Sequence, residues 1–160
     1  MSIVAKRSGA SPGVIYHYFE SKDDLLRAAY VDVKTASIAA IDAAGLEDLP
    51  PRDAFMRMWI NAYRYFVANR IEAQFIEQYE GMPGYKTPEV SAALAESEHY
   101  AALRRRFYSD EIGFPLKPLP IGVVNELTFT AALRLAVRLE PLDAEAQMAV
   151  AEACWAAISR

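Results

Sequence analysis

Apolar residues recur at intervals of three and four along most of this chain, and this spacing constrains the fold more than any other feature. A clear case is the run Phe55, Met58, Trp59, Ala62, Tyr63 and Phe66. Such intervals place side chains on one face of an α-helix, whereas half-buried strands need alternation. Runs of β-branched residues are scarce, and the prolines stand between the periodic segments. The sequence therefore predicts an all-α protein.

Residue types that begin and end helices divide the chain into segments. Ser11 followed by Pro12 is a typical helix start. Ser21 is another, with Asp24 placed as its capping-box partner, and Gly45 is typical of a helix end. We expect helices over 2–8, 11–19, 22–44, 52–69, 71–80, 87–110, 121–139 and 143–159, and a loop over 113–120.

The last two expected helices, 121–139 and 143–159, carry apolar or small residues on nearly all sides. A helix that is apolar all round has to be covered all round, and a chain of 160 residues has few elements left to do so. We therefore expect a homodimer in which these two helices of each copy form a four-helix arrangement across a two-fold axis.

Charge is unevenly distributed along the chain, whose formal net charge is −4 at pH 7. Residues 1–22 carry Lys6, Arg7 and Lys22 against Glu20, a balance of +2, so the remaining residues carry −6. The overall acidity argues against a protein that coats nucleic acid in general. The small basic segment at the N-terminus stands out as the part suited to contact phosphate.

The segment "VAKRSGASPGVIYHYF" predicts a helix, a tight glycine-containing turn and a second short helix. That arrangement is the helix-turn-helix, whose second helix enters the major groove of DNA. Ile15 and Phe19, four residues apart, would face the core, and the segment 12–14 with His17 would then face the groove. Phenol, imidazole and ammonium groups all donate hydrogen bonds to phosphate. The candidate DNA-binding residues are Lys6, Ser11, Pro12, Gly13, Val14, Tyr16, His17 and Lys22.

This segment resembles the N-terminal signature of the TetR family of transcriptional regulators. The matching positions are Val4, Ala5, Ser8, Gly9, Ala10, Ser11, Gly13, Ile15, Tyr16, Tyr18, Phe19, Ser21, Lys22 and Leu25. The resemblance implies an N-terminal helix-turn-helix, over 1–27, joined to a helical-bundle domain for ligand binding and dimerisation, over 28–160. Members of the family have a further helix before this motif, so the helix-turn-helix of the chain as given is expected to be incomplete.

Aromatic side chains gather in the middle of the chain at helical spacing. For any single one of them, a place in the hydrophobic core is the simpler interpretation. A buried tyrosine, however, needs a hydrogen-bond partner for its hydroxyl, and so many tyrosines suit a cavity with a polar edge. The candidate ligand-binding residues are Met56, Trp59, Tyr63, Phe75, Tyr79, Tyr100, Leu103, Phe107 and Phe129. Their thioether and ring surfaces predict a small apolar or aromatic effector.

Several classes of protein are disfavoured. The sequence has no HExxH motif, no clustered Cys and His and no G-x-S-x-G elbow, so we expect no metal site, no cofactor and no enzyme. Cys154, the single cysteine, lies among small apolar residues and is expected to be buried in a helix. The chain does not begin with a secretory pattern, and charged residues interrupt its most apolar stretch. We therefore expect a cytoplasmic protein that has no membrane partner.

The sequence leaves two functions open. The first is a ligand-responsive transcriptional repressor that binds a pseudo-palindromic double-stranded DNA operator as a homodimer and is released by a small apolar effector. The second is a helical protein that binds a small molecule but has no DNA-binding activity, because the first helix of the DNA-binding domain is missing.

Overall fold

The computed structural model of the chain describes residues 18–43, 45–108 and 113–160. Within these residues the chain forms eight α-helices, and its β pairing is limited to one isolated bridge between Leu116 and Ser159. The helices are α3 (Lys22–Ile41), α4 (Pro51–Ala68), α5 (Arg70–Glu80), α6 (Pro88–Ala95), α7 (Glu98–Tyr108), α8 (Ile121–Leu127), α9 (Phe129–Arg138) and α10 (Ala144–Ile158). The prediction of an all-α fold is confirmed. The expected helix over 2–8, and that over 11–19 as far as residue 17, lie outside the described residues.

Helix α4 lies at the centre of the body, because several other helices cover it. It packs against α9, α3, α10 and α5. Its sequence explains this position, since Phe55, Met58, Trp59 and Tyr63 each have at most 1% of their surface exposed. Burying a large apolar side chain contributes about 1.5–3 kcal/mol. The apolar face of α4 therefore supplies the main anchor for the surrounding helices.

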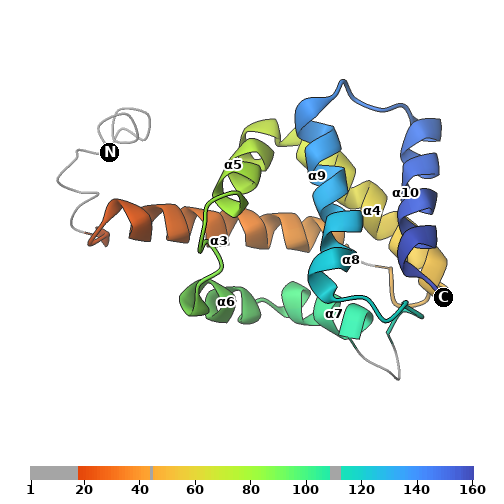
Figure 1. Cartoon of the computed structure of the whole chain (residues 1–160), viewed down its shortest axis with the longest axis horizontal. Coiled ribbons are helices and arrows are strands. Elements are labelled where there is room, and N and C mark those ends of the chain that lie inside the picture. Colours follow the sequence, from red (N-terminus) through yellow and green to blue (C-terminus); the bar gives the residue numbers. More distant parts are fainter. Residues whose placement is uncertain (1–17, 44, 109–112) are drawn as a thin grey trace.

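Helix α3 is long and runs from the N-terminal side of the molecule into the body, with α5 and α6 beside it (Figure 1). The predicted cap is confirmed, because the Ser21 hydroxyl accepts a hydrogen bond from the backbone N–H of Asp24 at 3.1 Å and donates one to its carboxylate at 2.8 Å. The helix ends at Ile41 rather than at residue 44. Gly45 follows with φ of 84°, a left-handed conformation that favours glycine.

The single helix expected over 87–110 is two helices, α6 and α7, so this prediction is wrong. Ser97 stands at the break, and its hydroxyl accepts a hydrogen bond from the backbone N–H of Tyr100 at 3.3 Å. A serine that bonds to the backbone in this way competes with a continuous helical ladder. The predicted start is confirmed, because the Thr87 hydroxyl accepts a hydrogen bond from the backbone N–H of Val90 at 3.3 Å.

The helix expected over 121–139 is also two helices, α8 and α9, which meet at Thr128 with φ −125° and ψ −89°. The Thr128 hydroxyl donates to the carbonyl of Val124 at 2.7 Å. The indole Nε1 of Trp59 donates to the carbonyl of Thr128 at 3.2 Å. These hydrogen bonds satisfy polar groups that the buried break would otherwise leave without a partner in an apolar core.

The remaining elements follow the prediction closely. The helices α4, α5 and α10 begin and end within one residue of the expected bounds, and residues 113–120 lie outside helices as expected. Lys117 fastens this loop to the end of α10, because its ammonium donates to the carbonyls of Ala156 at 2.7 Å and Ala157 at 3.1 Å. Cys154 is buried in α10, as predicted.

The described residues contain neither a membrane-spanning helix nor a cluster of metal ligands. None of their helices is at once long enough and apolar enough to cross a bilayer. No group of three or more His, Cys, Asp or Glu side chains in this part of the chain is arranged to hold a metal ion.

Trp59→Phe tests how much the bond at the α8–α9 break contributes to stability. The substitution removes the indole donor from the Thr128 carbonyl at a site with 0% exposure. We expect the free energy of unfolding to fall by about 1–3 kcal/mol. Urea denaturation followed by circular dichroism measures the change. Trp155→Phe, at a half-buried ring of α10, is the matched control. An equal loss in both variants would show that ring volume, and not the bond to Thr128, sets the effect.

Candidate functional site

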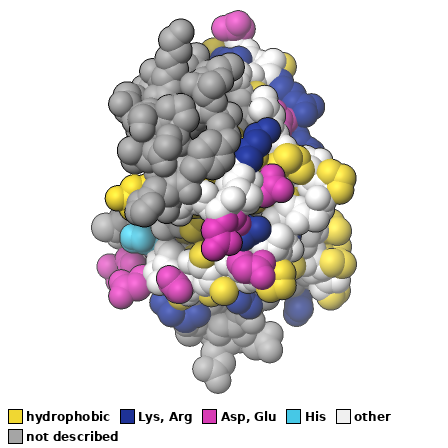
Figure 2. Space-filling view, turned by 90° about the vertical axis from the view of Figure 1, so that its left-hand side faces the viewer, with side chains coloured by type: hydrophobic (Ala, Val, Ile, Leu, Met, Phe, Trp, Pro, Cys, Tyr) yellow, Lys and Arg dark blue, Asp and Glu magenta, His cyan; other side chains and the backbone are white. Residues whose placement is uncertain are grey.

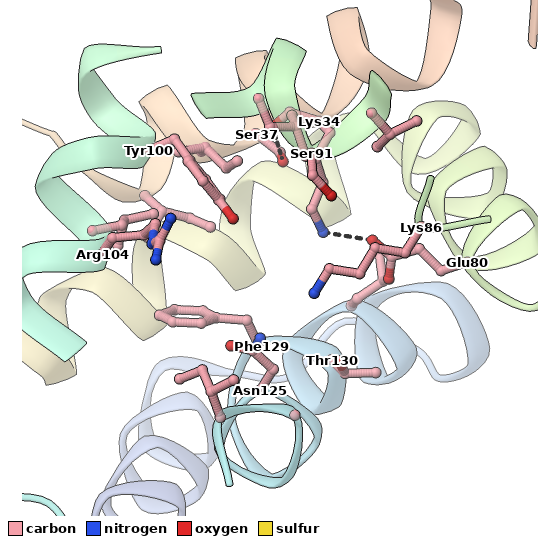
Figure 3. Close-up of a pocket in the computed structure, with 18 of the residues that line it drawn as sticks. Lys34, Ser37, Glu80, Lys86, Ser91, Tyr100, Arg104, Asn125, Phe129 and Thr130 are labelled. Atoms are coloured by element: carbon pink, nitrogen blue, oxygen red, sulfur yellow. Dashed lines mark hydrogen bonds and ion pairs between the residues drawn. The ribbon is translucent and has the colours of Figure 1, made fainter. Parts of the chain in front are cut away.

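A cavity of about 260 Å³ lies between α3 and the helices α6 to α9 (Figure 3). Much of its wall is apolar, and Ile38, Phe66, Leu94, Leu103, Phe107 and Phe129 are among the lining residues. Small-molecule sites typically enclose about 300–1,000 Å³, mostly apolar with a few placed polar groups. The volume of the cavity thus lies just below that range and suits a small ligand.

Four of the residues predicted to bind ligand line this cavity. They are Tyr100, Leu103 and Phe107 of α7 and Phe129 of α9. The α7 residues recur at intervals of three and four, which places them on one face of the helix. Phe107 packs edge-on against Phe129, with ring centroids 5.9 Å apart. The structure brings these four side chains together, and their contact with a ligand stays a prediction.

The other five predicted residues do not line the cavity. They are Met56, Trp59, Tyr63, Phe75 and Tyr79, and they pack in the core or against it. Trp59 stacks on Tyr63 with centroids 5.6 Å apart, and the Tyr63 hydroxyl accepts a hydrogen bond from the backbone N–H of Leu142 at 2.7 Å. Tyr79 stacks on Tyr30, at 4.3 Å. These rings therefore pack and hydrogen-bond with neighbours in the core. Helical spacing alone does not distinguish such core residues from residues that line a cavity.

The sequence predicted a polar edge made of tyrosine hydroxyls, but it did not indicate the charged residues Lys34 and Glu80 that form part of this edge. The Lys34 ammonium of α3 donates to Glu80 Oε1 of α5 at 2.7 Å, and the Tyr30 hydroxyl donates to the same oxygen at 2.8 Å. Burial, together with the Glu80 carboxylate, raises the pKa of Tyr30 above its ordinary value, and the same causes raise the pKa of Tyr85. These partners lie 46 and 50 residues apart in the chain, so no local pattern could pair them.

Helix α3 connects the cavity with the N-terminal segment. Five of its residues line the cavity, namely Tyr30, Lys34, Ser37, Ile38 and Ile41. Lys22 begins the same helix at its other end and is exposed. The other predicted DNA-binding residues, Lys6, Ser11, Pro12, Gly13, Val14, Tyr16 and His17, lie outside the described residues. A single helix thus connects the cavity with the expected DNA-binding region.

The surface near the start of α3 carries mixed charge, with acidic side chains gathered toward its centre (Figure 2). A groove there, lined by α3 and α6, contains the carboxylates of Asp24, Asp32 and Glu89 beside Arg27. Carboxylates repel phosphate, so this groove between α3 and α6 disfavours contact with DNA. Apart from Lys22, the basic N-terminal residues expected to contact DNA lie outside the described residues, and this contact stays a prediction.

Two family models match the chain. One describes a tetracyclin repressor-like C-terminal domain and matches residues 50–159, which hold the helices α4 to α10. The other describes bacterial regulatory proteins of the tetR family and matches residues 1–29. The chain belongs to the TetR family. The two matches fall on the segment that carries the signature and on the helical body that carries most of the cavity.

Relatives and solved structures agree with membership in the TetR family. The chain is 29% identical over 83 residues to an uncharacterized HTH-type transcriptional regulator of Haemophilus influenzae, a match that covers 52% of the chain and 44% of that relative. A TetR family protein from Vibrio parahaemolyticus superposes with a TM-score of 0.72 at 26% identity, over 98% of this chain and 85% of the other. A TetR family structure from Shewanella shares the fold, with a TM-score of 0.77 at 17% identity over 99% and 86% of the two chains.

Tyr30→Phe tests the polar edge through the pH dependence of stability. An unfolded tyrosine loses its proton near pH ~10, whereas folded Tyr30 keeps its proton to higher pH because its pKa is raised. The unfolded state therefore binds fewer protons above pH ~10, and stability falls there by up to about 1.4 kcal/mol per pH unit. We expect the fall to be shallower in Tyr30→Phe. Urea titrations at about pH 9 and about pH 11 measure it, and equal slopes in both proteins would contradict the assignment.

Proposed function

We propose that this TetR-family protein is a ligand-responsive transcriptional regulator, a repressor that binds operator DNA as a homodimer and releases it when a small molecule fills the cavity. The observation that carries this proposal is the path of α3, which lines the cavity through five residues and begins at Lys22, within the family signature. A ligand in the cavity touches the helix that leads to the DNA-binding segment.

The coupling would act through the position of α3. The Lys34–Glu80 ion pair and the Tyr30–Glu80 hydrogen bond tie α3 to the end of α5 at the cavity edge. A ligand that prefers another arrangement of these helices shifts the population toward it. Two DNA-binding segments of a dimer must lie about 34 Å apart to enter successive major grooves. A small change in the direction of α3 would therefore lower the affinity for the operator.

The surface of α8 and α10 supports the proposed homodimer. These two helices pack against each other. On them Val123, Leu127 and Met148 are 41%, 40% and 46% exposed, although all three are apolar. Ala149 and Ala153 of α10 are also exposed, and small residues allow another helix to approach closely. A second copy placed by a two-fold axis would cover these side chains with its own.

Met148→Arg tests the dimer. A guanidinium would be placed in an apolar interface against its symmetry mate, so we expect the dimer to dissociate into monomers, as measured by sedimentation equilibrium. Ile71→Arg is the matched control, because Ile71 is 81% exposed but lies on α5, away from α8 and α10. A dimer that persists in Met148→Arg would place the interface elsewhere.

Lys22→Ala tests the DNA contact. Lys22 is exposed at the start of α3, and a lysine that pairs with phosphate contributes equally to all sequences. We expect weaker binding to a random-sequence duplex and a slope of log affinity against log salt that is smaller by about one. Fluorescence anisotropy over a range of salt concentrations measures both. The control is Arg105→Ala, an exposed cation on α7.

The outcomes of that experiment separate the site from the function. An unchanged slope in Lys22→Ala would remove Lys22 from the interface while the regulator proposal stands. Absence of salt-dependent DNA affinity in the unsubstituted protein would contradict the regulator proposal itself, and would favour a protein that binds small molecules only.

A further inference from the structure

The charged side chains that line the cavity do not cancel. They are Lys34, Lys86 and Arg104 against Glu80 and Glu126, a balance of +1. Both carboxylates already have a cation, since Glu80 pairs with Lys34 at 2.7 Å and Glu126 pairs with Arg134 of α9 at 2.9 Å. Arg104 also has an interaction of its own. The positive charge left over at the cavity before any ligand enters is therefore that of Lys86.

Lys86 contributes directly to this surplus. It lies just before α6, is exposed, and its side chain points into the cavity (Figure 3). Among the residues that the structure describes, it has no ion-pair or hydrogen-bond partner. An ammonium at the mouth of an apolar cavity attracts an anion more strongly than one in open water, because the walls lower the local dielectric constant.

Neutral polar groups face Lys86 from other helices. The Tyr100 hydroxyl of α7 and the amide of Asn125 of α8 both point toward the cavity (Figure 3). Neither side chain has a hydrogen-bond partner within the described part of the chain. Leu103, Phe107 and Phe129 add apolar surface to the lining of the same cavity. The lining thus offers one unpaired cation, uncharged hydrogen-bonding groups and an apolar surface.

We propose that the effector is a small organic acid, in which an apolar body carries a single carboxylate that pairs with the Lys86 ammonium. This inference rests on the proposed function, because it names the ligand class for the same cavity. A monoanion matches the balance of +1, and a volume of about 260 Å³ limits the size of the body. A neutral ligand would gain no ion pair with Lys86, and a cationic one would be repelled by it.

The test compares acids with their amides on the unsubstituted protein. The probes are hexanoate, octanoate, benzoate and 3-phenylpropanoate, each with its primary carboxamide, and isothermal titration calorimetry measures the dissociation constants. An amide keeps the shape but loses the charge, and a hydrogen bond to a charged group is worth about tenfold or more in affinity. We expect at least one acid to bind about tenfold tighter than its amide.

Variants then assign the preference to Lys86. We expect Lys86→Gln to bring the ratio of acid to amide affinity close to one, and Lys86→Arg to retain most of it. Arg105→Gln removes the same charge from an exposed position that does not line the cavity, and it should leave the ratio unchanged. Thermal unfolding without ligand checks that all three variants fold.

Each possible outcome supports or overturns the organic-acid proposal or the proposed function. Ratios near one for all four pairs, no binding by any acid, or a ratio that survives in Lys86→Gln would overturn the organic-acid proposal. If a neutral amide binds and weakens DNA affinity, the proposed function stands without the acid. If an acid binds through Lys86 but leaves the DNA affinity of the protein unchanged, the ligand class stands and the proposed regulation fails.

Discussion

The burial of the apolar face of α4 is the constraint on which the rest of the described structure depends. Its side chains contact α3, α5, α9 and α10, so these four helices share one core. Trp59 shows how tight this requirement is, because it is fully buried and its only polar atom must reach the carbonyl of Thr128. The position of α4 thereby fixes where α8 ends and α9 begins, and those two helices form one wall of the cavity.

Four of the helices around the cavity, α6 to α9, are short and separated by breaks, whereas α3 is long. The break near Ser97 separates α6 from α7, and the break at Thr128 separates α8 from α9. Each break lets a helix change direction while side-chain hydroxyls satisfy the free backbone groups.

Stability and response are joined in α3. The same helix supplies Tyr30 and Ile38 to the core, contributes Lys34 to an ion pair at the cavity, and starts within the segment that carries the TetR-family signature. Lys34 and Glu80 lie at the edge of the cavity and not in the hydrophobic core of the protein. Their contact can therefore change without unfolding the helical body. A ligand therefore has access to the element that the proposed regulation needs to move.

The sequence by itself determined the all-α fold, most helix bounds, the cap at Ser21 and the family, because periodicity, capping and the signature are local patterns. The sequence also placed Tyr100, Leu103 and Phe107 on one face of a helix, because residues at intervals of three and four lie on the same side of it. The tertiary structure alone decided which aromatics line a cavity and which, like Tyr63, fill the core. It also decided the polar edge at Glu80, because contacts between residues far apart in the chain depend on how helices pack.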